Sequence, residues 1–246
     1  MIKNDPFKVH NINYLSPSSI NTYITDKSQW IMRYLFGIKS FSGASAMRGI
    51  ALEHVLAEKV EKGFYDFDML DKKFVALCGE AGIDLHEART EKERKSLEGY
   101  GKVLDEKFKY KKLEGYQEKV EVQLDDLPIP IIGYIDFLFD NTIVDLKTTA
   151  RIPSKPTESQ KRQMALYSMA YPDKKVDLFF ASSKDSKKFS LRSLSAYKKQ
   201  IKTVAFTIQR FLSLSEDKHS LAQYECPNTD SWMWSDKMKK EAEKIW

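Results

Sequence analysis

The segment 131–149 most constrains the fold, because two largely apolar stretches within it are separated by only two residues. The stretches are 131–139 and 142–149, with Asp140 and Asn141 between them. A two-residue connection made of turn-forming side chains predicts a tight antiparallel hairpin. Since both stretches are apolar at most positions, we expect this hairpin to belong to a sheet flanked by helices.

The predicted hairpin sets two carboxylates against each other. If Phe139 pairs with Thr142, the same register brings Asp136 opposite Asp145, with Cβ atoms about 5 Å apart. Side chains alternate along a strand, so Lys147 shares the face of Asp145. Facing carboxylates on an apolar sheet repel each other unless a positive charge lies between them. The pattern therefore predicts a site for Mg²⁺ or Mn²⁺ with an ammonium beside it. A solvated surface pair is the alternative, because the register could shift by one residue.

The other elements follow from hydrophobic periodicity and from turn and cap signals. We expect helices over 16–35, 47–62, 68–78, 90–112, 158–171 and 195–214, and further strands over 118–124, 176–182 and 187–193. Ser16 and Pro17 mark a helix start, and Thr157 and Gln160 have the spacing of a capping box. This order predicts a mixed α/β class with a helical first half and one central mixed sheet.

Charge and cysteine content limit the function classes. The 246 residues carry 40 Lys and Arg against 35 Asp and Glu, a net charge of +5 that permits a polyanionic partner. No apolar run is long enough to cross a membrane, and the N-terminus has no apolar leader. Cys78 and Cys226 are too few for a disulfide framework or a four-cysteine metal site, so we expect a reducing compartment.

Basic residues concentrate between positions 184 and 202, where the local net charge is +6. This run contains Lys184, Lys187, Lys188, Arg192, Lys198, Lys199 and Lys202. Because aromatic residues are interleaved with these cations, the run predicts a phosphate-binding surface for DNA. An ordinary solvated face is the alternative.

Three other polar side chains are candidates for a site. His54 lies on an apolar helix face, where it is either a metal ligand or a buried structural histidine. Gln163 and Tyr167 are four residues apart on one predicted helix and therefore point the same way. They form either a surface pair or a polar pair directed at a substrate backbone. Gly-rich phosphate loops and the motifs of zinc proteases and esterases do not occur in the sequence.

Taken in order, the motifs resemble the RecB-like branch of the PD-(D/E)xK nuclease superfamily. That branch includes CRISPR-adaptation exonucleases, the AddB nuclease domain and phage exonucleases. The matching stretches are Leu15-Ser16-Pro17-Ser18-Ser19-Ile20, Arg48-Gly49 followed by His54, Gly133-Tyr134-Ile135-Asp136, Asp145-Leu146-Lys147-Thr148, and Gln163 to Tyr167. His54 stands one residue beyond the tightest family spacing, Arg-Gly-x-x-x-His.

The resemblance implies a restriction-endonuclease-like core and a set of roles. One or two Mg²⁺ or Mn²⁺ ions would be bound by His54, Asp136, Asp145 and the carbonyl of Leu146. Lys147 would position the attacking water, with Gln163 and Tyr167 holding the DNA strand. The activity implied is metal-dependent exonucleolytic hydrolysis of DNA ends in recombination, repair or phage DNA metabolism. A structure-specific endonuclease and a non-catalytic DNA-binding subunit are the alternatives.

The resemblance also sets the expected organisation and partners. We expect one nuclease domain over 1–246, with a mainly helical part to about 114, the catalytic sheet over about 115–182 and a basic, helical remainder over about 183–246. Single- or double-stranded DNA is the expected partner, without a membrane. Recombination or helicase proteins and a second copy of the chain remain open as partners. The location implied is the cytoplasm of a bacterium, or of the host of a phage.

One departure from the family concerns its iron–sulfur cluster, which many members hold with one N-terminal and three C-terminal cysteines. Here Asp26-Lys27 stands at the N-terminal cysteine position, and Trp234 and Met238 stand at C-terminal ones. We therefore expect no iron–sulfur cluster. In its place we expect an apolar clamp formed by Trp232, Trp234 and Met238.

Overall fold

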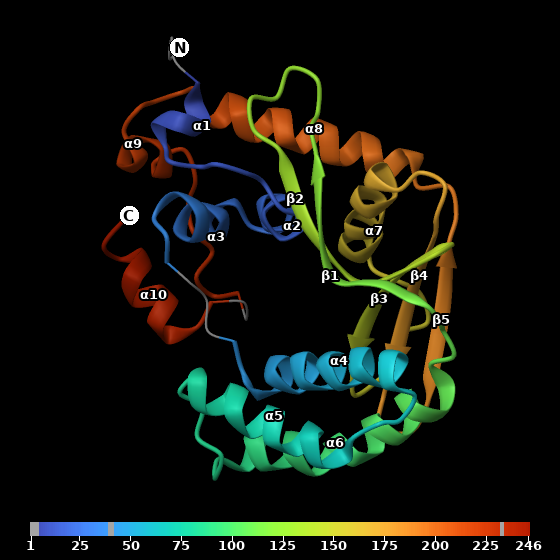
Figure 1. The fold of residues 1–246 in the computed structure, drawn as a ribbon. Helices are drawn as coiled ribbons and strands as arrows, with labels where there is room; N and C mark the ends of the chain where they lie inside the picture. The colour runs from blue at the N-terminus through green and yellow to red at the C-terminus, as the bar shows by residue number, and fades with distance from the viewer. Residues whose placement is uncertain (1–4, 39–41, 232–233) are drawn as a thin grey trace.

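The computed structural model describes residues 5–38, 42–231 and 234–246 and is centred on a five-stranded mixed sheet (Figure 1). The strands, in spatial order, are β1 (Leu113–Val122), β2 (Ile131–Phe139), β3 (Thr142–Thr148), β4 (Lys175–Ala181) and β5 (Ser186–Leu191). Strands β3 and β4 are parallel, and the other neighbouring pairs are antiparallel. The expected mixed α/β class is confirmed.

Helices cover both faces of this sheet (Figure 1). The layer on one face consists of α4 (Ala44–Lys62), α5 (Phe67–Glu80) and α6 (Ala88–Lys107). The layer on the other consists of α1 (Pro6–Val9), α2 (Pro17–Thr25), α7 (Glu158–Ala170) and α8 (Ser195–Leu212). The remaining helices are α3 (Lys27–Trp30), η1 (Ile31–Leu35), α9 (Lys218–Ala222) and α10 (Asp236–Ala242). Each face therefore has its own apolar core, with the sheet between them.

The register of the central hairpin agrees with the sequence prediction. Phe139 pairs with Thr142, and Phe137 pairs with Val144. Two predicted helices nevertheless differ in extent. The helix expected over 16–35 is broken at Asp26, which is extended and caps α3, and the helix expected over 90–112 ends at Lys107. Tertiary packing decides the second difference, because the buried Phe108 leaves the helix to join an aromatic cluster of the sheet.

The side chains of the β1–β2 ribbon change from one face of the sheet to the other near its middle. Val120 and Ile135 pack in the core beside α7, whereas Tyr116 and Phe137 pack on the side of α4. Residues two apart on a regular strand share a face, so this change of side marks a strong local twist. Between these pairs lies Gln117, whose φ of 51° is in the left-handed region that non-glycine residues rarely adopt. Asp136 faces it across the two strands.

The C-terminal residues close over the end of the N-terminal helical region. Trp234 and Met238 are buried with Met32 of η1, and Trp234 Nε1 donates a hydrogen bond of 2.9 Å to Oδ2 of Asp26. This contact joins Asp26 and Trp234, two positions that the resemblance described above assigns to cluster cysteines. The third member of the expected clamp, Trp232, lies outside the described residues. Cys78 is buried in α5, while Cys226 is exposed.

Among the described residues, none of the helices has both the length and the apolar character needed to cross a membrane.

Candidate active site

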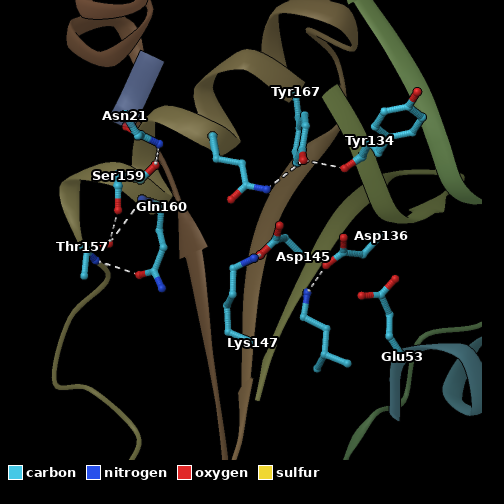
Figure 2. Close-up of polar contacts among 12 residues, drawn as sticks. Asn21, Glu53, Tyr134, Asp136, Asp145, Lys147, Thr157, Ser159, Gln160 and Tyr167 are labelled. Atoms are coloured by element: carbon cyan, nitrogen blue, oxygen red, sulfur yellow. Dashed lines mark hydrogen bonds and ion pairs between the residues drawn. The ribbon is translucent and has the colours of Figure 1, made fainter. Parts of the chain in front are cut away.

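The two aspartates of the hairpin meet where β2 and β3 separate. The pairing of these strands stops at Phe137 and Val144, one residue short of Asp136 and Asp145. Beyond that point the carboxylate of Asp136 replaces a backbone acceptor, since its Oδ2 accepts a hydrogen bond of 2.8 Å from the Leu146 N–H. The side chain of Asp136 is thus fixed at the fork between the strands (Figure 2).

Asp145 is fully buried and paired with Lys147. Its Oδ2 lies 2.6 Å from the Lys147 Nζ, whereas its Oδ1 accepts no hydrogen bond from any described residue. Burial alone would lower the pKa of Lys147, but the nearby charges of Asp145 and Asp136 outweigh it and raise this pKa. Lys147 is therefore held as an ammonium beside a carboxylate that retains an unused acceptor.

Glu53 of α4, and not the expected His54, faces these aspartates (Figure 2). His54 makes different contacts: its Nε2 lies 3.5 Å from Oε1 of Glu58, and its ring lies beside Tyr116. One residue along a helix turns the side chain by about 100°, so the two neighbours point to different surroundings. The tightest family spacing, with three residues after Gly49, in fact ends on Glu53, and this was the signal that could have identified it.

The docking of α4 explains why Glu53 points to the site. A Cβ on Gly49 would lie 3.3 Å from Oγ1 of Thr148, so this glycine lets the helix touch the end of β3. Arg48 secures the contact by donating to the Thr148 carbonyl at 3.4 Å and by pairing with Glu93 of α6. Glu53 follows Gly49 by one helical turn and lies on the same face.

Gln117 links two of the three carboxylates. Its Nε2 donates to Oε1 of Glu53 and lies 3.5 Å from Oδ1 of Asp136. The amide is brought there by the unusual backbone conformation at the twist of β1. No local sequence pattern indicates this residue, because its placement depends on how two distant segments cross.

Gln163 and Tyr167 lie together as predicted, but Tyr167 is buried. Gln163 Nε2 donates to the Tyr167 hydroxyl at 2.9 Å, and that hydroxyl donates to the Tyr134 carbonyl. Gly133 permits this packing, since a Cβ there would lie 2.8 Å from the Tyr167 ring. Burial, followed by the charge of Asp145, raises the pKa of Tyr167. Tyr167 is accordingly a neutral, buried group that orients the Gln163 side chain through the hydrogen bond to its hydroxyl.

The basic run does not form one continuous surface. Lys187 and Lys188 are consecutive on the edge strand β5 and therefore point to opposite faces of the sheet. Lys188 lies near the ring of Tyr110, whereas Lys187 lies near the loop at Arg151. Lys198 Nζ donates to a carbonyl of α7. The other members are exposed in the β4–β5 turn, after β5 and on α8: Lys184, Arg192, Lys199 and Lys202. A strand edge carrying lysines is also protected against pairing with other chains.

The donor set at the hairpin fits a hard divalent cation. Burial, then the charges of Asp145 and Glu53, raise the pKa of Asp136 well above its ordinary value, and burial also raises that of Glu53. A cation among these groups would relieve the repulsion and use the free oxygen of Asp145. Within the part of the chain that the structure describes, no three His, Cys, Asp or Glu side chains already lie close enough to hold an ion.

Comparisons with known proteins agree with this arrangement. The family model of the PD-(D/E)XK nuclease superfamily matches residues 14–239. No curated protein matches the sequence. The fold is similar to a crystal structure named "Putative exonuclease" from Eubacterium rectale, with a TM-score of 0.62 and 13% identity over 98% of this chain and 93% of that chain. SSO0001 aligns with a TM-score of 0.36 and 12% identity over 85% of this chain and 93% of that one, which is too low to indicate a shared fold.

The family model spans nearly the whole chain and includes both the strand fork and the helix of Gln163. The matched residues also include the paired aspartates and the adjacent lysine. The chain belongs to the PD-(D/E)XK nuclease superfamily.

Proposed function

We propose that this protein is a metal-dependent DNA exonuclease of the RecB-like branch. The observation that carries the proposal is the buried carboxylate of Asp145, which has one oxygen paired with Lys147 and one without a described partner. Superfamily members generally use divalent metal ions, and such an ion suits this oxygen and its neighbours. The name of the similar Eubacterium rectale protein, a putative exonuclease, supports an exonucleolytic activity.

The ion, Mg²⁺ or Mn²⁺, would be held by Asp136, Asp145 and the Leu146 carbonyl, with Glu53 in the place first expected for His54. When bound, it would lower the pKa of a water molecule and stabilise charge on the phosphate. Gln117 restrains Glu53 and Asp136 and so keeps the carboxylates directed at one another.

Lys147 contributes a fixed positive charge. Its ammonium can donate to the attacking water or to the developing oxyanion of the phosphate. Gln163 is oriented by Tyr167, and its side-chain carbonyl, which accepts no hydrogen bond from the described residues, can contact a DNA strand or the same water. These residues would position the nucleophile and the scissile phosphate together, which supplies much of the rate in phosphodiester hydrolysis.

The test is a cleavage assay that compares end-labelled linear DNA with a closed circle in Mg²⁺, Mn²⁺ and EDTA. Wild-type protein is expected to degrade the linear DNA from its ends and to leave the circle intact. Asp145→Asn is expected to abolish cleavage. Asp177→Asn is the matched control, since Asp177 is a buried aspartate on the adjacent strand β4 with its own partner, Tyr110, and should stay active.

The alternatives give different results in the same assay. Nicking of the circle would indicate an endonuclease. DNA binding without cleavage in either metal would indicate a non-catalytic subunit. Equal loss of activity in Asp145→Asn and Asp177→Asn would show that the effect of the former is a loss of fold.

A further inference from the structure

A groove of about 830 Å³ runs from α7, the helix of Gln163 and Tyr167, to the N-terminal segment at residues 11–14. Its lining includes Gln163 and Tyr167 of α7, Tyr134 of β2, Tyr14 and Arg33. It therefore begins at the polar pair of α7 and continues past β2 to the N-terminal segment. Nothing in the proposed chemistry uses its far end.

The N-terminal segment is fixed beside β2 by the backbone. Leu15 donates to the Pro130 carbonyl at 3.0 Å, and Ile132 donates to the Leu15 carbonyl at 2.8 Å. This bridge occupies the edge of β2 that β3 leaves free. Tyr14 is thereby held at the rim of the groove, next to the strand that carries Tyr134.

The helix α2 forms the opposite wall and is tied to α7. Asn21 of α2 donates to the Ser159 carbonyl at 3.1 Å and accepts from Arg162 Nε at 2.7 Å. The Asn21–Ser159 contact is visible in Figure 2. Since these bonds join the two helices that border the groove, its walls are set by the fold and do not depend on a mobile loop.

Two tyrosines project from distant parts of the sequence into the same groove. Tyr14 and Tyr134 remain 53% and 52% exposed, although both residues belong to well-packed segments. The Tyr134 carbonyl is held by Tyr167, so the backbone beneath its ring is fixed. Exposed, anchored aromatic rings are the surfaces on which unpaired bases stack.

The charge of the groove also suits a nucleic acid strand. Its described lining contains no Asp or Glu, in a chain with 35 of them, and it does contain the cation Arg33. The Nε of Arg33 is buried and has no hydrogen-bond partner among the described residues. Hydroxyl and amide side chains make up much of the remaining lining, including Ser18 and Asn13. Such groups can donate to phosphate oxygens without repelling them.

We propose that this groove binds an unpaired DNA strand and leads it to the active site, with Tyr14 and Tyr134 stacking on its bases. The proposal rests on the proposed nuclease function and deepens it, because it assigns a single-stranded substrate. In a duplex the base faces are covered by their neighbours, so tyrosines in this groove would favour the unpaired form.

The experiment measures fluorescence anisotropy of a labelled oligothymidylate and of a labelled blunt hairpin duplex in EDTA, where no cleavage occurs. The double variant Tyr14→Ala/Tyr134→Ala is expected to raise the Kd for the oligothymidylate at least about tenfold. The Kd for the duplex should change less than about twofold. Tyr224→Ala is the matched control, because Tyr224 is 60% exposed and lies outside the groove lining. It should leave both Kd values unchanged.

Two further measurements separate stacking from loss of fold. Tyr14→Trp/Tyr134→Trp is expected to restore tight binding, since tryptophan offers a larger face. In a photo-cross-linking experiment, an oligonucleotide that contains 5-iodouracil should become attached to wild-type peptides that contain Tyr14 or Tyr134.

The outcomes distinguish this proposal from the nuclease proposal. The groove proposal would be overturned if the double alanine variant left the Kd for the single strand unchanged or raised the Kd for both DNA forms equally. It would also be overturned if the wild type did not bind single-stranded DNA. If the wild type still cleaves DNA, the nuclease function then stands alone. If the protein binds single-stranded DNA through these tyrosines but cleaves no DNA, the groove proposal would be supported and the nuclease proposal would be overturned.

Discussion

Glu53 follows Gly49 by four residues on the same face of α4. Because Gly49 has no side chain, α4 packs closely against Thr148, and Glu53 then faces Asp136 and Asp145. This relationship explains why the acidic residue, and not the neighbouring His54, reaches the hairpin. It also gives the site a third carboxylate, which increases the negative charge that a cation would balance.

Replacing Glu53 should affect cleavage much more than replacing His54. We expect Glu53→Gln to lower the cleavage rate at least about 100-fold, because it removes a negative charge that would hold the proposed metal ion. His54→Ala should lower it less than about threefold. Glu53→His introduces the ligand type that the resemblance implies and should recover part of the rate. A severe loss in His54→Ala alone would return the ligand role to that histidine.

Removing the Asp136 charge should stabilise the metal-free protein while it abolishes cleavage. The pKa of Asp136 is raised in the folded state by burial and by its acidic neighbours, so its ionised form disfavours folding. We expect Asp136→Asn to raise Tm in EDTA by at least about 2 °C near neutral pH.

The pH dependence of this stabilisation has a definite sign. The folded state binds the Asp136 proton more tightly than the unfolded state, so the stability contributed by this group falls as pH rises through the folded-state pKa. The Tm advantage of Asp136→Asn should therefore shrink as pH is lowered toward 4. Adding Mn²⁺ should raise the wild-type Tm and not that of the variant. A variant less stable than the wild type throughout would contradict this electrostatic account.

Lys147→Met should reduce both turnover and stability. Loss of the ammonium removes a donor to the reacting groups, which typically costs about 10²–10³ in rate. It also leaves Asp145 as a buried charge without a partner, so unfolding in urea with EDTA should show a loss of about 3 kcal/mol. The double variant Lys147→Met/Asp145→Asn should recover most of this stability and none of the activity. Failure of that recovery would show that Lys147 acts mainly through packing.

Basic residues on α8 should contribute to DNA affinity through charge alone. Lys199 and Lys202 are exposed one turn apart, and Lys199→Gln/Lys202→Gln should weaken binding and reduce the slope of log Kd against log salt by about 1–2. Lys237→Gln/Lys240→Gln on α10 provides a control with the same charge change, exposure and spacing. Equal salt slopes in the two double variants would show that the α8 lysines are merely solvated.

The C-terminal clamp should stabilise the fold. Deleting residues 226–246 removes Trp234 and Met238 from their contacts with Met32, and we expect a Tm at least about 5 °C lower. Trp234→Phe keeps a ring but loses the hydrogen bond to Asp26, so it should cost about 1–2 kcal/mol in urea unfolding. An unchanged Tm after the deletion would contradict the clamp.

Local patterns in the sequence determined the hairpin of the candidate active site. The two-residue turn set the register of β2 against β3, and strand alternation put Lys147 beside Asp145, because both depend only on neighbours along the chain. Capping signals likewise located the starts of α2 and α7 at Ser16 and Thr157.

Tertiary structure decided which side chains join that hairpin. Glu53 reaches it because α4 docks on β3 at Gly49, and Gln117 reaches it because β1 and β2 twist over each other. Burial of Tyr167 against Gly133 and the division of the basic run between two faces also depend on packing. Side-chain direction on a helix changes by about 100° per residue, so a register that the sequence leaves open by one position is fixed only by contact with the rest of the molecule.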